Sequence, residues 1–362
     1  MYTPLRFLRD IVWKGRPIHL TFFLTRKCNS HCPFCFYLRS DAAPVARGPE
    51  LSLPEIEKIS SSLGSLLWLA FSGGEIFLRD DLVEIATAFY RNNRPSFMLF
   101  PTNGLLPEVI RDRMERIVRS CPESVVALKL SLDGVGQAHD DLRRTPGSFA
   151  KVMETYRVLS DLAGHYRNFE LGVNTVFCSE NQDAMDGIIG FVGGLENVRT
   201  HTISLVRGDL ADKRYGSVDL DAYHDAVRKL ERNLQEGASR VYRFRGGRLK
   251  AAQDVLQRRL IHRTMRDRER QVPCYAGRLN LVLTEEGSVF PCEILSASFG
   301  NVREFGYDLQ KAACSPQARR VQAAIMDNGC SCTHECNYLT NIFFNPRLYP
   351  ALLKEYLLLR PR

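Results

Sequence analysis

The sequence predicts an α/β protein built on a parallel sheet, followed by a smaller region rich in cysteine. Six short apolar runs typical of strands alternate with stretches of helical periodicity over the first two thirds of the chain. Such alternation implies parallel strands joined by right-handed crossovers. The alternation then stops, and six of the eleven cysteines follow between positions 274 and 336. The pattern alone leaves two architectures open, an open barrel and a doubly wound sheet.

The expected elements follow in order along the chain. The six strands are Leu20–Thr25, Leu67–Ser72, Ser96–Thr102, Val125–Leu132, Glu170–Phe177 and Thr200–Val206. Helical periodicity is expected over roughly 80–93, 107–120, 145–164 and 180–194. A further helix begins after Ser52, because Ser52 and Glu55 form a capping-box pattern with Pro54 in the first turn.

We expect five parts. They are an N-terminal amphipathic helix (1–18), the α/β core (19–235), a basic helical linker (236–270), a cysteine-rich domain (271–340) and a helical tail (341–362). A hydrophobic content of 44% and a charged content of 25% are ordinary for a soluble globular protein. No apolar run has the length of a membrane span, and no signal peptide is visible. Many cysteines in such a chain favour the cytoplasm and metal ligation over disulfides.

The net charge of +8 is concentrated in one segment. Residues 239–271 contain eleven basic and three acidic residues, together with a partial apolar stripe of helical spacing. A basic amphipathic helix suits an acidic membrane surface, an anionic substrate or an acidic electron-transfer partner. It is equally consistent with a solvated face packed on its own domain. Nucleic-acid binding is a less favoured interpretation of this segment, and the N-terminal helix could make a peripheral membrane contact.

Cys28, Cys32 and Cys35 follow the first expected strand with the spacing C-x3-C-x2-C. Three thiolates on one loop can hold three irons of a [4Fe–4S] cluster and leave the fourth iron open. A closed zinc site would need a fourth ligand, and the alternative is a zinc loop completed by His31 or a distant residue. An iron that is free to bind a small molecule is the favoured interpretation.

Glycines and short polar side chains end the next three strands. The three motifs are Ser72-Gly73-Gly74-Glu75, Thr102-Asn103-Gly104 and Ser131-Leu132-Asp133-Gly134. Glycines let the backbone approach a ligand closely, and Glu75 offers an acceptor for an ammonium group. Each motif alone could be ordinary turn chemistry. Because the carboxyl ends of parallel strands meet at one edge, we expect the motifs and the cysteine loop to form one site.

A second set of cysteines follows the basic segment. Cys274 and Cys292 flank Gly287 in the pattern C-x12-G-x4-C, and Cys330, Cys332 and Cys336 form C-x-C-x3-C. These five residues are enough for one further four-iron cluster, and a zinc ribbon is the alternative. The remaining cysteines, Cys121, Cys178 and Cys314, are expected to be structural thiols.

From Cys28 to about Val206 the sequence resembles the radical S-adenosylmethionine (SAM) superfamily. The resemblance implies a partial (β/α)6 barrel of the TIM type, with a [4Fe–4S] cluster on Cys28, Cys32 and Cys35 whose open iron binds SAM. The residues expected to contact SAM are Phe34, Ser72, Gly73, Gly74, Glu75, Asn103, Ser131, Asp133, Arg143 and Asn174.

The second set of cysteines resembles the opening of the SPASM and twitch domains of the same superfamily. A full SPASM domain has seven cysteines and two clusters, so five cysteines imply one auxiliary [4Fe–4S] cluster. The implied ligands are Cys274, Cys292 and Cys336, with Cys330 or Cys332 as the fourth.

The resemblance implies an oxidoreductase or transferase that reductively cleaves SAM to a 5′-deoxyadenosyl radical, which removes hydrogen from an unactivated C–H bond. The electron would come from a low-potential donor such as flavodoxin or ferredoxin. The basic segment, and the presence of only about twenty residues before the first strand, favour an anionic or lipid-linked small molecule as substrate. One alternative is a maturase of a ribosomal peptide or protein side chain. A different class would be an iron–sulfur electron-transfer or scaffold protein.

Overall fold

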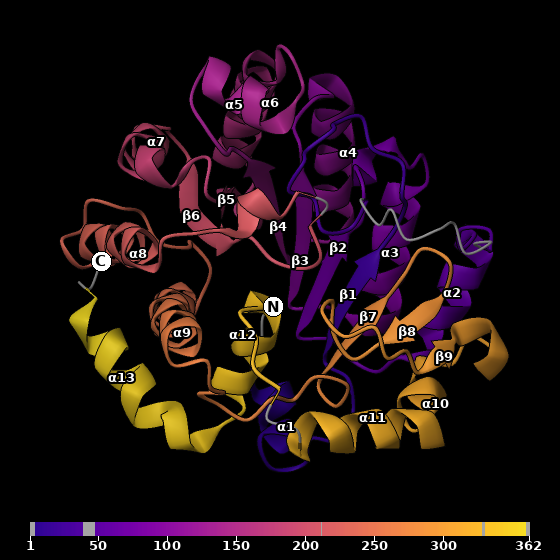
Figure 1. Ribbon diagram of the computed structural model, residues 1–362. Helices are drawn as coiled ribbons and strands as arrows, with labels where there is room; N and C mark the ends of the chain where they lie inside the picture. Colours follow the sequence, from indigo (N-terminus) through magenta and orange to yellow (C-terminus); the bar gives the residue numbers. More distant parts are fainter. Residues whose placement is uncertain (1–3, 39–47, 211, 328–329, 360–362) are drawn as a thin grey trace.

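A computed structural model describes residues 4–38, 48–210, 212–327 and 330–359 (Figure 1). These residues contain one nine-stranded sheet with the order β6-β5-β4-β3-β2-β1-β7-β8-β9. The first six strands are β1 (His19–Phe23), β2 (Trp68–Ser72), β3 (Phe97–Thr102), β4 (Val125–Ser131), β5 (Phe169–Phe177) and β6 (Val198–Leu205). All six pair in parallel, which confirms the predicted strands and crossovers.

The cysteine-rich region contributes three more strands to the same sheet. They are β7 (Asn280–Leu283), β8 (Ser288–Phe290) and β9 (Gly300–Asn301). Strand β7 pairs in parallel with β1, and His19 lies opposite Asn280. Strands β8 and β9 continue the sheet in antiparallel orientation. Main-chain hydrogen bonds therefore join this region directly to the core, rather than loop contacts alone.

Helices cover both sides of the curved sheet. In Figure 1, α2 to α8 stand on its outer side, while α9 and α12 stand on its inner side. The outer helices are α2 (Leu53–Ser62), α3 (Leu82–Asn93), α4 (Pro107–Ser120), α5 (Gln137–Arg143), α6 (Ser148–His165), α7 (Met185–Gly193) and α8 (Leu220–Gln235). The others are α1 (Leu8–Val12), α9 (Gly247–Asp267), α10 (Leu309–Ala313), α11 (Pro316–Asp327), α12 (Glu335–Phe343) and α13 (Tyr349–Leu358). The predicted capping box of Ser52 and Glu55 is present at the start of α2.

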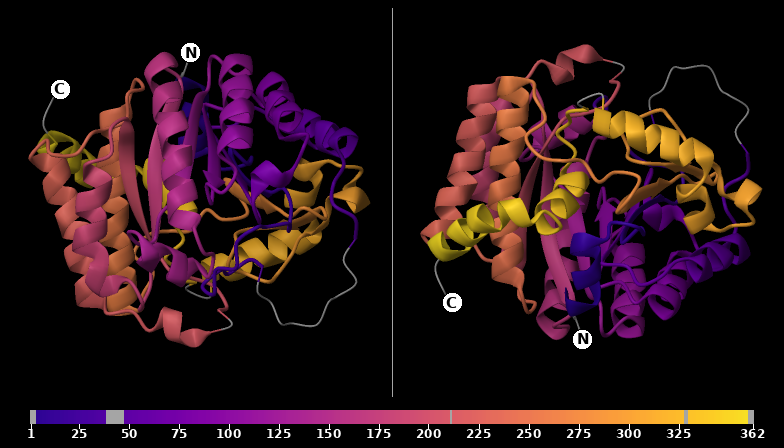
Figure 2. Two further views of the ribbon diagram at one scale, coloured as in Figure 1. Left: turned by 90° about the horizontal axis from the view of Figure 1, so that it is seen from above. Right: turned by 90° about the horizontal axis from the view of Figure 1, so that it is seen from below.

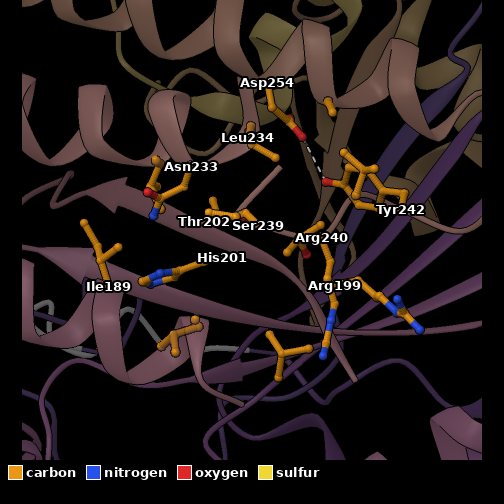
Figure 3. Close-up of a pocket in the computed structure, with 18 of the residues that line it drawn as sticks. Ile189, Arg199, His201, Thr202, Asn233, Leu234, Ser239, Arg240, Tyr242 and Asp254 are labelled. Atoms are coloured by element: carbon orange, nitrogen blue, oxygen red, sulfur yellow. Dashed lines mark hydrogen bonds between the residues drawn. The ribbon is translucent and has the colours of Figure 1, made fainter. Parts of the chain in front are cut away.

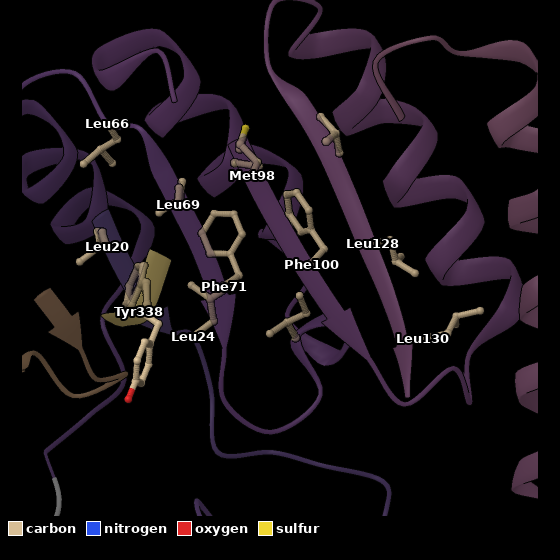
Figure 4. Packing of buried hydrophobic residues seen from close by; sticks show 14 of the residues in the cluster. Leu20, Leu24, Leu66, Leu69, Phe71, Met98, Phe100, Leu128, Leu130 and Tyr338 are labelled. Carbon is tan, nitrogen blue, oxygen red and sulfur yellow. The ribbon is translucent and has the colours of Figure 1, made fainter. Parts of the chain in front are cut away.

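The two faces of the sheet differ in polarity because alternate side chains of a strand point to opposite sides. Outward-facing residues such as Phe71, Phe100 and Leu128 pack beneath the outer helices and are fully buried (Figure 4). Each such side chain contributes about 1.5–3 kcal/mol of hydrophobic stabilisation. The alternate positions of β4 to β6 carry polar residues, among them Lys129 and Ser131. The apolar face thus holds the fold together, and the polar inner face is available for chemistry.

The basic segment lies within the fold. Much of it forms α9, which is packed against α8, α12 and α13, and Lys250 and Arg258 are buried. Arg259 pairs with Glu231 at 2.9 Å and with Glu355 at 2.6 Å. Packing on its own domain, one of the two interpretations of this segment, is therefore what the structure shows. None of the helices in the described ranges has the length and apolarity needed to cross a membrane.

Candidate functional site

The three cysteines of the first loop line one cavity of about 580 Å³. The loop follows β1, so it lies at the carboxyl ends of the parallel strands. The predicted residues that share this cavity are Cys28, Cys32, Cys35, Ser72, Gly73, Gly74, Glu75, Asn103, Ser131 and Arg143. The structure thus brings together the ends of β2, β3 and β4 and the cysteine loop that follows β1, as the topology predicts.

The two glycines that end β2 pack directly against the cysteine loop. The backbone N–H of Gly74 donates to the carbonyl of Thr25 at 2.7 Å, and that of Glu75 donates to Lys27 at 2.8 Å. A Cβ at Gly74 would lie 2.1 Å from the Lys27 carbonyl oxygen. Glycine is therefore required here because the backbone of β2 approaches the backbone that carries the first cysteine.

Glu75 is buried and joins the ends of β2 and β3. Its carboxylate accepts hydrogen bonds from the Thr102 hydroxyl at 3.0 Å and from the backbone N–H groups of Asn103 at 2.8 Å and Phe77 at 3.2 Å. Burial raises the pKa of Glu75 to about 7. A carboxylate offers about four acceptor positions, so one remains for a cationic group in the cavity.

Hydrogen-bonding groups that the sequence analysis did not single out surround the cysteines. The Ser30 hydroxyl lies 3.2 Å from the Cys32 sulfur. The Asn103 amide donates to the Asn29 side chain at 2.7 Å, with its nitrogen 3.8 Å from the Cys28 sulfur. Such contacts orient metal ligands and tune the potential of iron–sulfur clusters. Ser30 and Asn29 lie inside the cysteine motif itself, which was the available signal for them.

Arg143 supplies a buried positive charge to the cavity. Its guanidinium donates to the Asp133 carboxylate at 2.6 Å, and the same carboxylate accepts from the Val176 backbone N–H at 2.7 Å. Asp133 is fully buried behind Arg143 and does not line the cavity. Burial raises the pKa of the Cys32 thiol, and Arg143 opposes this effect by favouring the thiolate.

Phe34 and Asn174 do not line this cavity. Phe34 is buried and packs near Tyr215, with 6.0 Å between the ring centroids. Asn174 lies on β5, where its side-chain oxygen is 2.8 Å from the Ser204 hydroxyl. Contact of these two residues with SAM stays a prediction.

Four cysteines of the second set are neighbours. Burial, together with the nearby thiols of Cys332 and Cys330, raises the pKa of Cys274 to about 11. Burial likewise raises the pKa of Cys292 to about 12, with Cys332 and Cys274 adding to the shift. Because a cluster binds thiolates, loading this group would release protons. Four soft sulfur donors, two of them buried and two half-buried, fit a [4Fe–4S] cluster.

Cys336 has different neighbours. Its sulfur and ligand atoms of Glu293 and His334 all lie within 4.8 Å of one another. Glu293 is also 3.0 Å from the guanidinium of Arg207 and 2.8 Å from the His334 ring. Cys336 thus lies in a buried charged network, and its role as a cluster ligand stays a prediction.

The cysteine loop, the strand-end motifs and the curved parallel sheet define an iron–sulfur enzyme. The Radical SAM superfamily model matches residues 22–192. This part of the chain is similar to the radical SAM superfamily, in agreement with the resemblance of the sequence, and the comparisons support the predicted cofactors, a [4Fe–4S] cluster with SAM and an auxiliary cluster in the cysteine-rich region.

The relatives differ in how much of the chain they share. AdoMet-dependent heme synthase of Methanosarcina barkeri (strain Fusaro / DSM 804) is 26% identical over 306 residues, which cover 81% of this chain and 82% of that protein. The antilisterial bacteriocin subtilosin biosynthesis protein AlbA of Bacillus subtilis (strain 168) is 30% identical over 148 residues, 40% of this chain. The alignment spans 31% of the length of AlbA.

Solved structures show the same fold. Native anSMEcpe with bound AdoMet superposes with a TM-score of 0.59 at 16% identity, covering 94% of this chain and 99% of that one. At this identity the match shows the fold alone. The match extends through the cysteine-rich region, so the whole architecture has a counterpart among known structures.

Proposed function

We propose that this chain is a radical SAM oxidoreductase or transferase that removes a hydrogen atom from an unactivated C–H bond of an anionic small molecule. The observation that carries the proposal is the convergence of the three cysteines and the ends of β2, β3 and β4 on one cavity. When bound, the cluster and SAM supply one-electron, hydrogen-abstracting chemistry. In the cell, flavodoxin or ferredoxin would deliver the electron, and the cytoplasm stays the predicted location.

The residues of the cavity have distinct tasks in this proposal. Cys28, Cys32 and Cys35 would hold the cluster. Arg143, fixed by Asp133, would bind the carboxylate of SAM, because a buried guanidinium is well suited to a carboxylate. Glu75 would accept from the ammonium group with its remaining lone pair. The strand ends keep these groups in place and exclude water from the reacting atoms.

The class of substrate is inferred from the relative that aligns over most of both chains. AdoMet-dependent heme synthase matches this chain from the barrel into the cysteine-rich region, whereas AlbA shares 40% of it. Haem and its precursors are tetrapyrroles with carboxylate side chains. A tetrapyrrole carboxylic acid is therefore the anionic small molecule that we propose to test first.

A peptide or protein side chain is the second candidate substrate. AlbA, by its name, serves the biosynthesis of a bacteriocin, and its match to this chain is 30% identical. The match covers less than half of this chain, so it supports shared cofactor chemistry more strongly than a shared substrate.

The test is release of 5′-deoxyadenosine from the anaerobically reconstituted protein given dithionite and SAM. We expect release by the unaltered chain and its loss, by at least about 100-fold, in Cys32→Ala, because an iron–sulfur ligand is removed. Cys314→Ala is the matched control, because Cys314 is exposed and lies outside both cysteine groups. An iron-replete protein that releases none would instead indicate an electron-transfer or scaffold protein. Deuterium transfer from labelled candidates into 5′-deoxyadenosine would then identify the substrate.

A further inference from the structure

Lys129 is a cation on the inner face of the sheet. Its ammonium donates to the hydroxyl of Thr200 at 2.5 Å and to that of Thr202 at 3.1 Å. An ammonium group carries three N–H donors. Within the described residues, the third donor has no hydrogen-bond partner, and no carboxylate oxygen lies within 4.0 Å of the ammonium. Lys129 is half-buried, and within the described residues it lacks the direct ion-pair partner that a cation largely removed from water usually has.

The acidic groups that act on Lys129 also contact other residues, and Glu170 on β5, which is 3.9 Å from Arg243, keeps one carboxylate oxygen without a hydrogen-bond partner among the described residues. Asp254 on α9 forms an ion pair with Lys250. Glu335 on α12 accepts a hydrogen bond from the Ser204 hydroxyl at 2.8 Å. Burial lowers the pKa of Lys129 to about 7, and the attraction of Asp254 and Glu335 does not offset it. An unpaired charge in such surroundings is costly, which is a reason to expect a ligand that completes the site.

Gly172 provides the room for the ammonium group. Gly172 on β5 lies opposite Lys129 on β4 and opposite Thr200 on β6. A Cβ at position 172 would lie 2.7 Å from the Lys129 nitrogen and 2.5 Å from the Thr200 hydroxyl oxygen. Three neighbouring strands thus supply, at one level, a cation, an open position and a hydroxyl group. We call this arrangement of Lys129, Gly172 and Thr200 the cradle. A residue larger than glycine at position 172 would fill it.

The cradle lies between two cavities. Ser131, two residues further along the same face of β4, lines the cavity of the cysteine loop. The distance along the strand is about 6.6 Å, because a parallel strand rises about 3.3 Å per residue. On the other side, Thr200 and Thr202 line a second cavity of about 150 Å³ bounded by β6, α8 and α9 (Figure 3). Lys129 lines neither cavity, and its ammonium reaches across β5 to β6, so a ligand group there would lie roughly 10 Å from Ser131, since neighbouring strands are about 4.8 Å apart.

We propose that Lys129, with Thr200 and Thr202, binds an anionic group of the substrate, specifically a carboxylate of a small molecule. This inference rests on the proposed function and adds a specificity-determining residue to it. A carboxylate would accept the free N–H of Lys129 in a charge-assisted hydrogen bond. The rest of the substrate would extend across the inner face of the sheet toward Ser131, so that a more distant carbon of a molecule as large as a tetrapyrrole reaches the cluster cavity.

The test measures binding of coproporphyrin III, a tetrapyrrole with four carboxylates, to the anaerobic holoenzyme with SAM by absorbance titration. We expect Lys129→Met to weaken binding at least tenfold, because the cation is lost at nearly constant volume. The tetramethyl ester of the same probe should bind equally weakly to both proteins. Lys151→Met is the matched control, because Lys151 is exposed on α6 and pairs with Glu154 at 2.8 Å. It should bind the acid as the unaltered chain does.

A second variant separates charge from position. Gly172→Ala keeps every charged group, but its Cβ would displace the flexible end of Lys129. We expect Gly172→Ala to weaken binding of coproporphyrin III as well. SAM cleavage by the unaltered protein is measured separately.

The pH dependence supplies a further measurement. The charged and titratable groups around Lys129 are Lys250, Asp254 and Arg258 on α9, Glu335 on α12, His201 on β6 and Glu170 on β5. A lowered lysine pKa means that the binding cation is present at low pH and lost as pH rises through that value. Affinity should therefore fall above about pH 7 in the unaltered chain, and a bound carboxylate will move the fall to higher pH. In Lys129→Met the affinity should stay flat over this range.

The outcomes separate this inference from the proposed function. If the unaltered protein releases 5′-deoxyadenosine, but Lys129→Met and Gly172→Ala bind the acid as tightly as it does, the carboxylate subsite is wrong and the proposed function stands. Failure of the unaltered protein to bind the acid also overturns the subsite. If a glutamate-containing peptide binds in a Lys129-dependent way and the tetrapyrrole does not, the small-molecule assignment is overturned.

Discussion

At the scale of single residues, the cysteines of the C-terminal region separate by their neighbours. The thiols of Cys274, Cys292, Cys330 and Cys332 affect one another, whereas Cys336 lies against Glu293 and His334. Four thiolates complete a [4Fe–4S] cluster. We therefore predict that Cys336→Ser retains both clusters, at about eight irons per chain, and that Cys274→Ser loses about four of them. Iron and acid-labile sulfide analysis after anaerobic reconstitution checks this.

Cys121→Ser controls for loss of a buried thiol, because Cys121 lies at the end of α4 and no other thiol of the described residues affects its pKa, and this variant should keep its iron. Mössbauer spectra separate a lost cluster from partial loading of both. Loss of four irons in Cys336→Ser would contradict the prediction and restore Cys336 as a ligand, with Cys330 or Cys332 left free.

The first cysteine loop could be predicted from sequence because its ligands are close in the chain and strand order fixes their place. Whether Phe34 and Asn174 line the cavity was harder to predict, because this depends on the direction of their side chains rather than on sequence spacing. Lys129 was missed, although a signal existed. It is the charged residue within the apolar strand Val125–Ser131, on the face that alternation assigns to the interior.

At the scale of elements, the junction between α2 and α3 depends on one buried side chain. The Asn93 amide donates to the carbonyls of Ser60, Leu63 and Gly64 at 2.8–3.0 Å, and so satisfies the C-terminal end of α2. We predict that Asn93→Ala lowers the free energy of unfolding by about 2 to 3 kcal/mol, because buried carbonyls lose their donor.

Thermal melting followed by circular dichroism measures the Asn93→Ala effect. Asn92→Ala is the matched control, because Asn92 is exposed and makes one bond, to the Ser60 hydroxyl at 2.8 Å. Equal melting temperatures for the two variants would show that Asn93 does not stabilise this junction.

The six long strands and the capped helix α2 could be predicted because apolar runs and capping patterns are local. Strands β7 to β9 were not, because they have four, three and two residues and lie among turns. The basic segment was predicted as a helix, but its pattern could not show which face is buried. The buried face of α9 is set by its contacts with α8, α12 and α13. Such tertiary contacts cannot be read from a local sequence pattern.

At the scale of the whole molecule, the core and the cysteine-rich region are joined at β1. Strand β1 has β2 on one side and β7 on the other, so residues 280–283 complete its hydrogen bonding. Helices α9 and α12 stand at the inner face of the same sheet, as Figure 1 and the further views in Figure 2 show. The cysteine-rich region is therefore positioned by the same sheet that positions the first cysteine loop.

We predict that residues 1–235 alone do not form a soluble folded core, although sequence reasoning places a boundary there. Removing the rest exposes the edge of β1 at His19–Phe22 and uncovers the inner face, and unpaired edges of this kind pair with other chains. Soluble yield, size-exclusion chromatography and cooperative melting measure the outcome. A chain ending at residue 348 is the control, because it keeps β7 to β9 and α12 and lacks α13. It should stay folded with a lower melting temperature, since α13 packs on α9. A monomeric, cooperatively melting 1–235 fragment would instead show that the barrel core folds independently of the cluster region.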